Sequence, residues 1–229
     1  MAKDEADIIQ DTVKNQILNG CDYVYVYDNM SSDKTFTLLK DLQQVYPNIV
    51  VRADPDPAYY QAKKMNTWIQ QIVNYHGMSW IIPFDADEFW IWKREDFENW
   101  DREGIDCSRF VLRNYIPIID DNDNILDWRF EIGPIHFGKV AFKATGQTNI
   151  LAGNHSAVNV KTEIIADEDY NYINHFQYRS FEQMKKKLIN GKKAYDLTNL
   201  PPEVGNHWRQ DWTDEKIHQY WKDFCKGSK

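Results

Sequence analysis

The sequence is poor in cysteine, and the few cysteines that it has are far apart. They are Cys21, Cys107 and Cys225, an odd number at wide spacings. A disulfide framework needs an even set of cysteines, and a structural zinc site needs closely paired thiols. We therefore expect neither, and the composition favours a reducing compartment, because stable disulfides belong to oxidising ones.

Long apolar runs are also missing. A membrane-spanning helix needs about 20 consecutive apolar residues, and no stretch of the chain approaches that length. The opening MAKDEAD is polar almost from its first residue, so it lacks the apolar region of a signal peptide. We expect a cytoplasmic protein without a membrane span.

Positive charge is in deficit. The chain carries 27 Lys and Arg against 35 Asp and Glu, which gives a formal net charge of −8. An acidic surface repels the phosphates of nucleic acids, so no nucleic-acid partner is expected. Clustered carboxylates instead suit divalent cations.

Aromatic residues, in contrast, are abundant. They make up 14% of the chain and include nine Trp and thirteen Tyr. Exposed rings serve ligand-binding surfaces, those for sugars among them, and buried rings build a core; the composition leaves both readings open. The 229 residues, 42% of them hydrophobic, suffice for a single domain with a sizeable core.

Helical and strand patterns alternate through the first 90 residues. Apolar residues three or four positions apart predict helices at residues 4–18, 35–46 and 59–75. β-Branched and aromatic runs predict strands at residues 23–27, 49–51 and 80–84. This alternation predicts an α/β, Rossmann-like fold with a mostly parallel sheet and helices on both faces.

The pattern changes after residue 101, where short strands predominate. We predict an antiparallel-rich second half with strands at residues 110–119, 125–132, 139–142, 157–160 and 172–176, and helices at residues 180–190 and 213–224.

Acidic side chains follow each of the three early strands. Asp28 comes after the first, Asp54 after the second, and Asp85, Asp87 and Glu88 after the third. Ligands of open α/β sheets bind outside the carboxyl ends of the strands. If the strands are parallel, these acids meet at one edge of the sheet.

The Asp85-Ala86-Asp87 sequence is the sharpest of these signals. Two carboxylates one residue apart can hold a hard cation through oxygen ligands. That cation could bridge the two phosphates of a sugar nucleotide and stabilise a leaving diphosphate. A solvated loop with paired acids is the alternative, because an acidic chain yields this spacing often, but the position after a buried strand favours a site.

Three segments resemble GT-A fold glycosyltransferases of the family-2 type. Residues 25–35, YVYDNMSSDKT, resemble the family's strand-turn-helix segment. Residues 80–89, WIIPFDADEF, resemble its strand followed by Asp-Ala-Asp-Glu-Phe. Residues 174–182, NHFQYRSFE, resemble the later His-x-x-x-Arg/Lys-Ser segment of a subgroup near the family-92-like enzymes. The likeness extends from residue 4 to about residue 192.

The resemblance implies roles for the matched residues. Asp28 and Asp54 would lie near the nucleotide base and ribose, and Asp85 would face the ribose or a metal. Asp87 would bind Mn²⁺ or Mg²⁺ directly, with His175 as a further ligand. A histidine beside a strand is otherwise a packed, hydrogen-bonded residue.

Other matched positions concern the diphosphate and the first strand. Lys63, Lys64 and Asn66 match a helix that would reach the diphosphate, with a solvated helix face as the alternative. The family opens with a hydrophobic strand before a segment like residues 3–7, yet only two residues precede that segment here. We therefore expect a sheet that begins one strand short, unless the natural chain continues upstream.

The general base is open among several residues. An inverting transferase needs a carboxylate or histidine within about 3 Å of the acceptor hydroxyl. The candidates are Glu131, His155, Asp196 and Asp211, of which we favour Asp211, in the aromatic and polar run HWRQDW.

Two cations in the second half have two possible roles. Arg209 and Lys139 could neutralise phosphate or pair with acids at the surface.

The resemblance thus implies one GT-A catalytic domain, with residues 1–100 binding the nucleotide sugar and residues 101–229 binding the acceptor. The expected reaction is metal-dependent, inverting transfer of a sugar from a nucleoside diphosphate sugar, of the uridine type, to a glycan or similar hydroxyl acceptor. A sugar nucleotidyltransferase is an alternative, although its usual Gly-rich phosphate loop after the first strand is missing. A non-catalytic nucleotide-sugar or carbohydrate-binding module is another.

Overall fold

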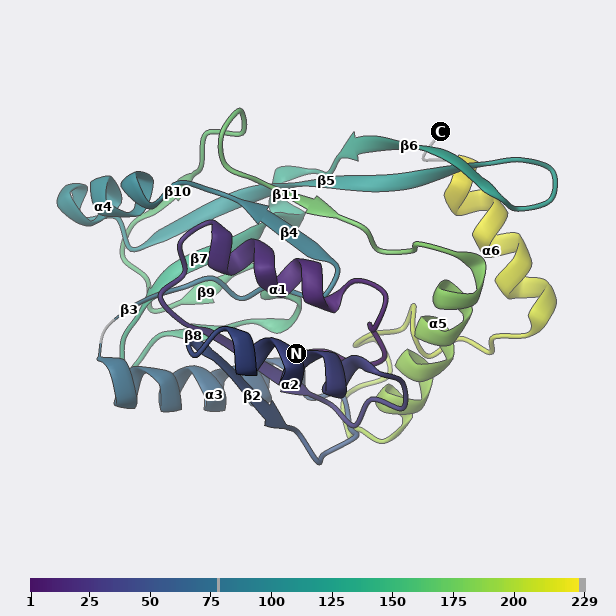
Figure 1. Ribbon diagram of the computed structural model, residues 1–229, viewed down its shortest axis with the longest axis horizontal. Coiled ribbons are helices and arrows are strands. Elements are labelled where there is room, and N and C mark those ends of the chain that lie inside the picture. Colours follow the sequence, from purple (N-terminus) through teal and green to yellow (C-terminus); the bar gives the residue numbers. More distant parts are fainter. Residues whose placement is uncertain (78, 227–229) are drawn as a thin grey trace. The chain divides into compact units, whose positions relative to one another are not determined.

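The computed structural model describes residues 1–77 and 79–226 (Figure 1). Its first part follows the predicted alternation, with element ends shifted by a few residues. The elements are α1 (Ile9–Leu18), β1 (Val24–Asp28), α2 (Thr35–Val45), β2 (Ile49–Ala53), α3 (Gln61–His76) and β3 (Ser79–Ile81). They are followed by β4 (Glu88–Ile91) and α4 (Arg94–Glu103), which the sequence did not predict.

The remainder is rich in short strands, as predicted. It contains β5 (Cys107–Ile119), β6 (Ile125–Ile132), β7 (Lys139–Ala144), β8 (Asn149–Ile150), β9 (Ala157–Val158), β10 (Glu163–Ile165), β11 (Tyr172–His175), α5 (Phe181–Asp196) and α6 (Asp214–Lys226). Two short 3₁₀ turns complete it, η1 (Ile135–Phe137) and η2 (Ala152–Asn154).

The strands pair in both directions, so the fold is mixed α/β. β1 pairs with β2 in parallel, and β10 pairs with β5 in parallel. The larger sheet has the order β3-β7-β5-β11-β4, with β6 and β10 also paired to β5. Its pairs β3–β7, β5–β7 and β4–β11 are antiparallel. The predicted α/β class is therefore confirmed, whereas the predicted mostly parallel arrangement holds for β1 and β2 and does not extend to β3 and β4, which pair antiparallel with later strands.

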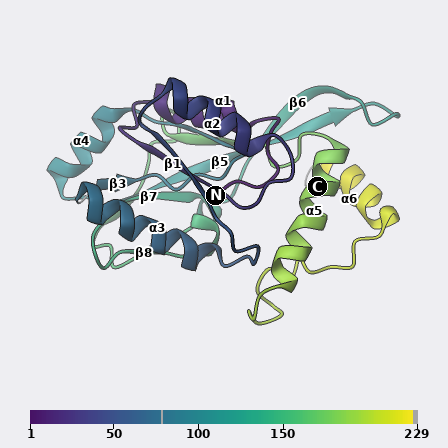
Figure 2. The ribbon, with the colours of Figure 1, turned by 60° about the horizontal axis from the view of Figure 1, so that its bottom comes forward.

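Helices cover both faces of β1, as its alternating side chains require. Val24 and Val26 pack with apolar residues of α1 and α2 in one cluster, whereas Tyr27 stacks on Trp68 of α3, with ring centroids 3.8 Å apart. Figure 2 shows α1 and α2 on one side of this strand and α3 on the other.

The start of the chain joins the free side of β1. Ala2 forms an isolated parallel bridge with Asp28. The Ala2 amide donates to the carbonyl of Tyr27 at 2.9 Å, and the Asn29 amide donates to the carbonyl of Ala2 at 2.8 Å. A single bridge thus stands where the resemblance places a whole strand.

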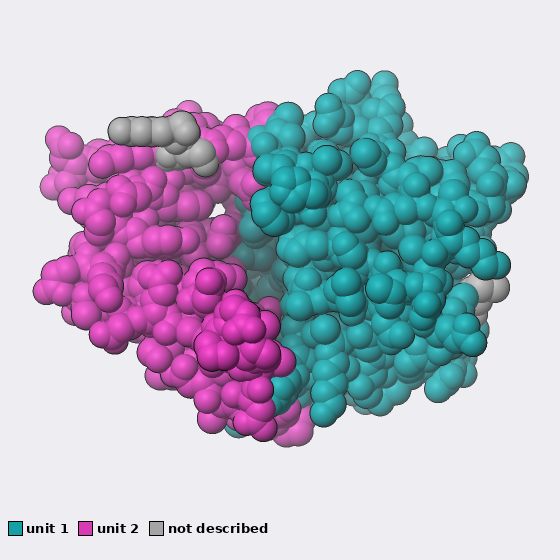
Figure 3. Space-filling view, turned by 180° about the vertical axis from the view of Figure 1, so that it is seen from behind, with its two compact units in different colours: residues 1–54, 60–113, 132–175 teal, residues 55–59, 114–131, 176–229 magenta. Residues whose placement is uncertain are grey.

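The chain forms two compact units, coloured separately in Figure 3. Unit 1 comprises residues 1–54, 60–113 and 132–175, and unit 2 comprises residues 55–59, 114–131 and 176–229. This division differs from the predicted halves 1–100 and 101–229, whose assignment to donor and acceptor stays a prediction. The acids that follow β1, β2 and β3 all belong to unit 1.

Many of the aromatic rings build cores within the units. Trp90 and Phe110 are fully buried in unit 1, and Trp221 is fully buried in unit 2. Burying a side chain of this size stabilises the fold by about 2–3 kcal/mol. The three cysteines are free thiols. Within the described ranges, no helix combines the length and the apolar character that a membrane crossing requires.

Candidate functional site

The ends of β1 and β2 bring Asp28 and Asp54 together, as predicted. The backbone amide of Asp54 donates to the carbonyl of Asp28 at 2.8 Å. Asn29 Nδ2 donates to Asp54 Oδ2 at 2.8 Å, and Lys64 Nζ, from α3, lies 2.7 Å from the same oxygen. Lys64 therefore neutralises a buried carboxylate at the strand ends.

Only one of the two carboxylate oxygens of Asp28 accepts a hydrogen bond within the described part of the chain. Its Oδ2 accepts from the backbone amide of Ser31 at 3.1 Å. Its Oδ1 is buried, and nothing in the described part of the chain hydrogen-bonds to it. Because an unsatisfied buried carboxylate oxygen is costly, this atom is a candidate to accept a hydrogen bond from a ligand.

An ion-pair triad, in which Lys139 and Glu88 are buried and Asp85 is partly exposed, lies where β3 leads into β4. Lys139 Nζ, from β7, lies 2.6 Å from Asp85 Oδ2 and 2.9 Å from Glu88 Oε1. Burial acts to lower the pKa of Lys139, but Asp85 and Glu88 together raise it above the ordinary value of 10.5. Burial likewise acts to raise the pKa of Asp85, and Lys139 outweighs it, so that this pKa falls below 3.8. Lys139 and Asp85 are therefore charged at neutral pH.

The second oxygen of Asp85 faces two amide side chains. Gln61 Nε2 and Asn154 Nδ2 each lie 3.4 Å from Asp85 Oδ1. Gln61 Oε1 in turn accepts from the backbone amide of Gly153 at 2.8 Å. Asp85 thus connects the start of α3 to the η2 turn. Sequence reasoning missed Gln61 and Asn154, since a lone amide residue has no distinguishing spacing.

Asp87 faces His175 across the β4–β11 pair. Antiparallel pairing sets His175 opposite Glu88, next in sequence to Asp87. His175 Nε2 lies 3.7 Å from Asp87 Oδ2, and the Asp87 side chain is 5% exposed. The structure therefore brings together the two residues that the resemblance implies as metal ligands.

The residues present fit a cation only if the ligand completes its coordination. Within residues 1–77 and 79–226, no three His, Cys, Asp or Glu side chains form a group that could hold a metal ion. Catalytic Mg²⁺ typically takes one or two carboxylates plus substrate phosphates. Asp87 and His175 match such an open set, whereas Asp85 already holds Lys139.

His155 lies beside the triad, in the same unit. Its Nδ1 is 3.2 Å from the carbonyl of Gly138. A carbonyl can only accept, so Nδ1 carries the proton and Nε2 has a free lone pair. Burial, assisted by the charge of Lys139, lowers the pKa of His155 below 6.5, and the ring is neutral at pH 7.

Arg109 holds the backbone of His155 in place. Arg109 Nη1 donates to the carbonyl of His155 at 2.6 Å. Arg109 Nη2 also lies 2.6 Å from Glu163 Oε1 on β10. The loop that carries His155 is thereby attached to the β5–β10 pair.

Several of the acidic side chains affect the pKa of the amino group at the start of the chain. Burial lowers the pKa of the Met1 amino group, and Asp85, Glu88 and Asp54 act in the opposite direction. Electrostatic effects of this kind weaken with distance, so Asp54, Asp85 and Glu88 all lie within electrostatic reach of the start of the chain.

Other predicted residues have structural partners. Asn66 Nδ2 donates to the carbonyl of Ile150 at 2.9 Å, and the Ile150 amide donates to Asn66 Oδ1 at 2.7 Å. These bonds hold β8 and do not direct Asn66 toward the acids. Lys63 is exposed on α3, which agrees with a solvated helix face.

The remaining base candidates belong to unit 2. Glu131 pairs with Arg129 at 4.0 Å, and Asp196 pairs with Lys192 at 2.7 Å. Asp211 is exposed, and its backbone carbonyl accepts from a lysine of α6. Among the four candidates, only His155 belongs to the unit that holds the acids, so the preference for Asp211 gains no support.

Of the two basic residues predicted to neutralise phosphate or pair with acids, Arg209 and Lys139, only Lys139 belongs to unit 1. Arg209, in unit 2, donates to Thr198 Oγ1 at 2.9 Å. Lys139 pairs with the fully buried Glu88 and with Asp85, whose side chain is 32% exposed.

No protein-family model matches the sequence, and no curated protein does. The chain is similar in structure to the CTP:phosphocholine cytidylyltransferase LicC of Streptococcus pneumoniae, with a TM-score of 0.34 and 15% identity over 59% of this chain. It spans 56% of the length of LicC. It is also similar to a protein assigned as a glucose-1-phosphate thymidylyltransferase from Bacillus anthracis, with a TM-score of 0.43, 9% identity and 85% of each chain covered. Likeness at this level says nothing about the reaction.

Proposed function

We propose that the protein is a glycosyltransferase that takes a nucleoside diphosphate sugar of the uridine type as donor. The observation that carries the proposal is the gathering of Asp28, Asp54, Asp85 and Asp87 at successive strand ends of one unit, with Asp87 facing His175 at 3.7 Å. Ligands of α/β proteins bind at such strand ends. The acceptor would be a glycan or a similar molecule with a hydroxyl group.

Each charged group has a separate task in this proposal. The free oxygen of Asp28 accepts a hydrogen bond from the ribose or base of the donor. Asp87 and His175 hold Mn²⁺ or Mg²⁺. When bound, such a cation supplies positive charge that stabilises a diphosphate leaving group. Lys139 keeps Asp85 ionised and fixed, so that Asp85 positions Gln61 and Asn154 around the donor.

His155 is the group best suited to take the proton of the acceptor hydroxyl. The lone pair on its Nε2 is available at neutral pH, because the pKa of the ring is lowered and Nδ1 holds the proton against Gly138. This assignment replaces Asp211 as the favoured base.

A sugar nucleotidyltransferase is the second candidate, and Lys139 is the observation in its favour. A buried lysine beside acidic residues could balance the charge of a triphosphate. Against it stands the segment after β1, residues 28–35, which contains no glycine and so lacks the backbone cradle of a Gly-rich phosphate loop.

Calorimetry with UDP tests the site. We expect Mn²⁺ to strengthen UDP binding to the native chain, and Asp87→Asn to abolish that gain. Asp41→Asn, at an exposed position on α2, is the matched control and should retain it. An Asp87→Asn variant that keeps the full Mn²⁺ dependence would show that the site is misassigned.

Product analysis then separates the reactions. Release of UDP from a panel of UDP-sugars supports a glycosyltransferase. Release of pyrophosphate from UTP and sugar 1-phosphates identifies a nucleotidyltransferase instead. If UDP-sugars bind but remain intact under both conditions, with and without simple glycan acceptors, the protein is a binding module.

A further inference from the structure

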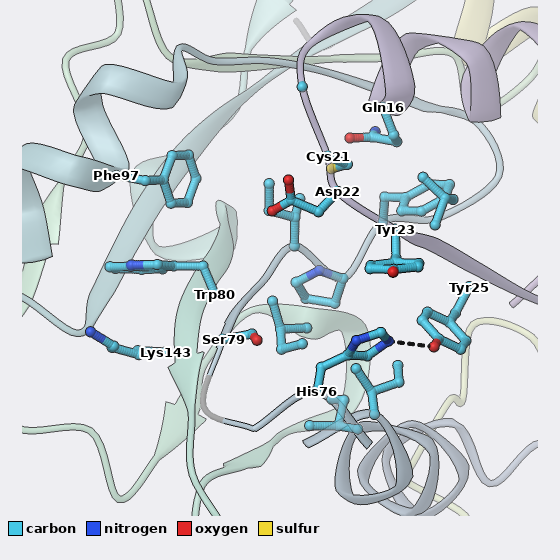
Figure 4. Close-up of a pocket in the computed structure, with 18 of the residues that line it drawn as sticks. Gln16, Cys21, Asp22, Tyr23, Tyr25, His76, Ser79, Trp80, Phe97 and Lys143 are labelled. Carbon is cyan, nitrogen blue, oxygen red and sulfur yellow. Dashed lines mark hydrogen bonds between the residues drawn. The ribbon is translucent and has the colours of Figure 1, made fainter. Parts of the chain in front are cut away.

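Apolar side chains meet solvent along β6, the second strand of the β5–β6 hairpin (Figure 1). In unit 1, by contrast, rings such as those of Tyr23, Trp80 and Phe97 line the walls of a cavity of about 790 Å³ (Figure 4). On β6, Leu126 is 67% exposed and Phe130 is 48% exposed. Single apolar side chains at a surface are ordinary, but a row of them along one strand indicates an interaction surface.

The sequence of β6 separates into an apolar face and a charged face. Side chains alternate between the two faces of a strand, so Leu126, Trp128 and Phe130 share one face. Asp127 and Arg129 share the other. A shift of one residue in pairing would exchange the two faces. A strand that pairs with β6 must therefore match apolar with apolar and charge with charge.

The second edge of β6 is suited to accept another strand. Within the described ranges, β5 is the strand that pairs with β6. The Trp128 amide donates to Asp127 Oδ1 at 2.8 Å, which is a local bond of the kind that competes with the ladder bonds of a sheet. Natural proteins protect exposed edges with lysine or proline, and the β6 sequence ILDWRFEI contains neither.

We propose that β6 pairs with β6 of a second copy of this chain, antiparallel, about a twofold axis at Trp128. A twofold interface joins the same surface of both copies, so the strand must be complementary to itself. With the axis at Trp128, Asp127 lies opposite Arg129 of the partner subunit. Leu126 then lies opposite Phe130 of the partner subunit. Opposite charges and apolar pairs that face each other across two strands both stabilise a sheet.

Charge and strand length select this register. An axis at Asp127 would set that carboxylate opposite its own copy, and an axis at Arg129 would do the same with the guanidinium. Like charges directly opposite each other destabilise a strand pair. An axis at Phe130 would pair residues 128–132, a shorter span than the residues 125–131 that an axis at Trp128 pairs.

Pairing would exchange the local bond at the axis for two bonds between the copies. The Trp128 amide would donate to the carbonyl of Trp128 of the partner subunit, because residues of a hydrogen-bonded pair exchange both of their bonds. The Asp127 carboxylate, released from that amide, would accept from Arg129 of the partner subunit. The Arg129 side chain is 34% exposed and lies 4.0 Å from Glu131 Oε1. A guanidinium has enough N–H donors to serve a second carboxylate.

Sedimentation equilibrium of the full chain measures the association. The native chain should form a dimer, and Asp127→Arg and Arg129→Asp should each weaken it by about tenfold or more, because like charges then face each other. An equimolar mixture of the two variants should associate again as a heterodimer, since all its facing charges are of opposite sign. Asp121→Arg makes the same change of charge at an exposed position of the preceding turn and should associate like the native chain.

Two outcomes of this experiment would overturn the proposal. One is a native chain that stays monomeric at every concentration tested. The other is a mixture that associates as weakly as either of its components does alone. Recovery in the mixture supports the pairing and also shows that both variants are folded.

Disulfide capture tests the register without changing a charge. Leu126→Cys and Phe130→Cys chains, mixed and oxidised, should form the mixed disulfide, because side chains directly opposite have Cβ atoms about 5 Å apart. Each variant alone should not link to itself, since its two new thiols lie about 13 Å apart along the strands. The native chain, oxidised in parallel, accounts for Cys21, Cys107 and Cys225. Mixed and self-linked disulfides in equal amounts, measured by mass spectrometry, would overturn the register.

Discussion

Lys139 Nζ lies 2.6 Å from Asp85 Oδ2, and the same nitrogen lies 2.9 Å from Glu88 Oε1. The Glu88 side chain is fully buried and that of Lys139 is 6% exposed, whereas Asp85 keeps 32% of its side-chain surface in contact with solvent. One buried cation therefore compensates two carboxylates at the start of β4.

Removal of this cation should destabilise the fold strongly. Lys139→Met leaves the buried Glu88 carboxylate without its counter-ion, which typically costs about 3–5 kcal/mol. Urea unfolding followed by tryptophan fluorescence measures the change. Lys143→Met is the control, because Lys143 pairs with Asp101 at the surface and such pairs contribute about 1 kcal/mol or less. Equal losses in the two variants would refute the structural importance of the triad.

The same triad should shape how stability depends on pH. The pKa of Asp85 is lowered below 3.8 by Lys139, so its contribution is complete above that value and is lost as pH falls through the folded-state pKa. The pKa of Lys139 is raised above 10.5 by the two acids, so its contribution is complete below 10.5 and is lost at higher pH. Unfolding at a series of pH values should show both limbs, and Lys139→Met should weaken them.

His155 should control the acid limb of activity. Because the pKa of the ring is lowered from 6.5, kcat/KM should fall only below that pH, where Nε2 becomes protonated. His155→Asn should reduce kcat by about 10²–10⁴-fold with little change in KM for the donor. His136→Asn, an exposed histidine on η1, should leave the pH profile intact. A normal profile in His155→Asn would transfer the role of base to another residue.

Gly153 should tolerate no side chain. Its φ is +75°, and a Cβ there would lie 2.5 Å from Cδ2 and 2.7 Å from Nε2 of the His155 ring. Gly153→Ala should therefore displace the ring and lower kcat. Gly146→Ala has open space around the new methyl group and should keep native activity. Equal kcat in both variants would contradict the arrangement around His155.

A substitution at Asn66 distinguishes its two possible roles, which are to hold β8 in place and to bind the diphosphate. If it only holds Ile150 of β8, Asn66→Ala should cost about 1–3 kcal/mol in stability without changing UDP affinity at a temperature where the variant is folded. A loss of UDP affinity without a loss of stability would restore the diphosphate role that the resemblance implies.

The sequence predicts most of the helices and strands, and the two that it misses, β4 and α4, were missed for physical reasons. Strong periodicity located α2 and β6 within a residue of their observed ends. β4 was missed because Glu88–Ile91 comes directly after the acidic turn and forms a strand only through its pairing with β11. α4 was missed because its highly charged sequence leaves only Phe97 and Trp100 buried, too few for a clear helical repeat.

The candidate site was predictable where chemistry is encoded locally. Asp28, Asp54 and Asp87 follow from strand ends, and His175 follows from the resemblance. The roles of Lys139 and His155 depend on β7 and the η2 turn reaching the acids, which is a property of the tertiary fold. A sequence pattern could suggest Lys139 as a phosphate partner, but only the packing of β7 against β3 and β5 shows that acids of the same chain surround it.

Arg109 spans from Glu163 at the surface to the backbone of His155. We therefore expect few residue types other than a carboxylate to be accepted at position 163, although it does not itself belong to the acidic site. Homologues that retain histidine at position 155 should also retain arginine at position 109 and a carboxylate at position 163. Directed-evolution libraries that randomise the three codons together should recover that combination in preference to any single member.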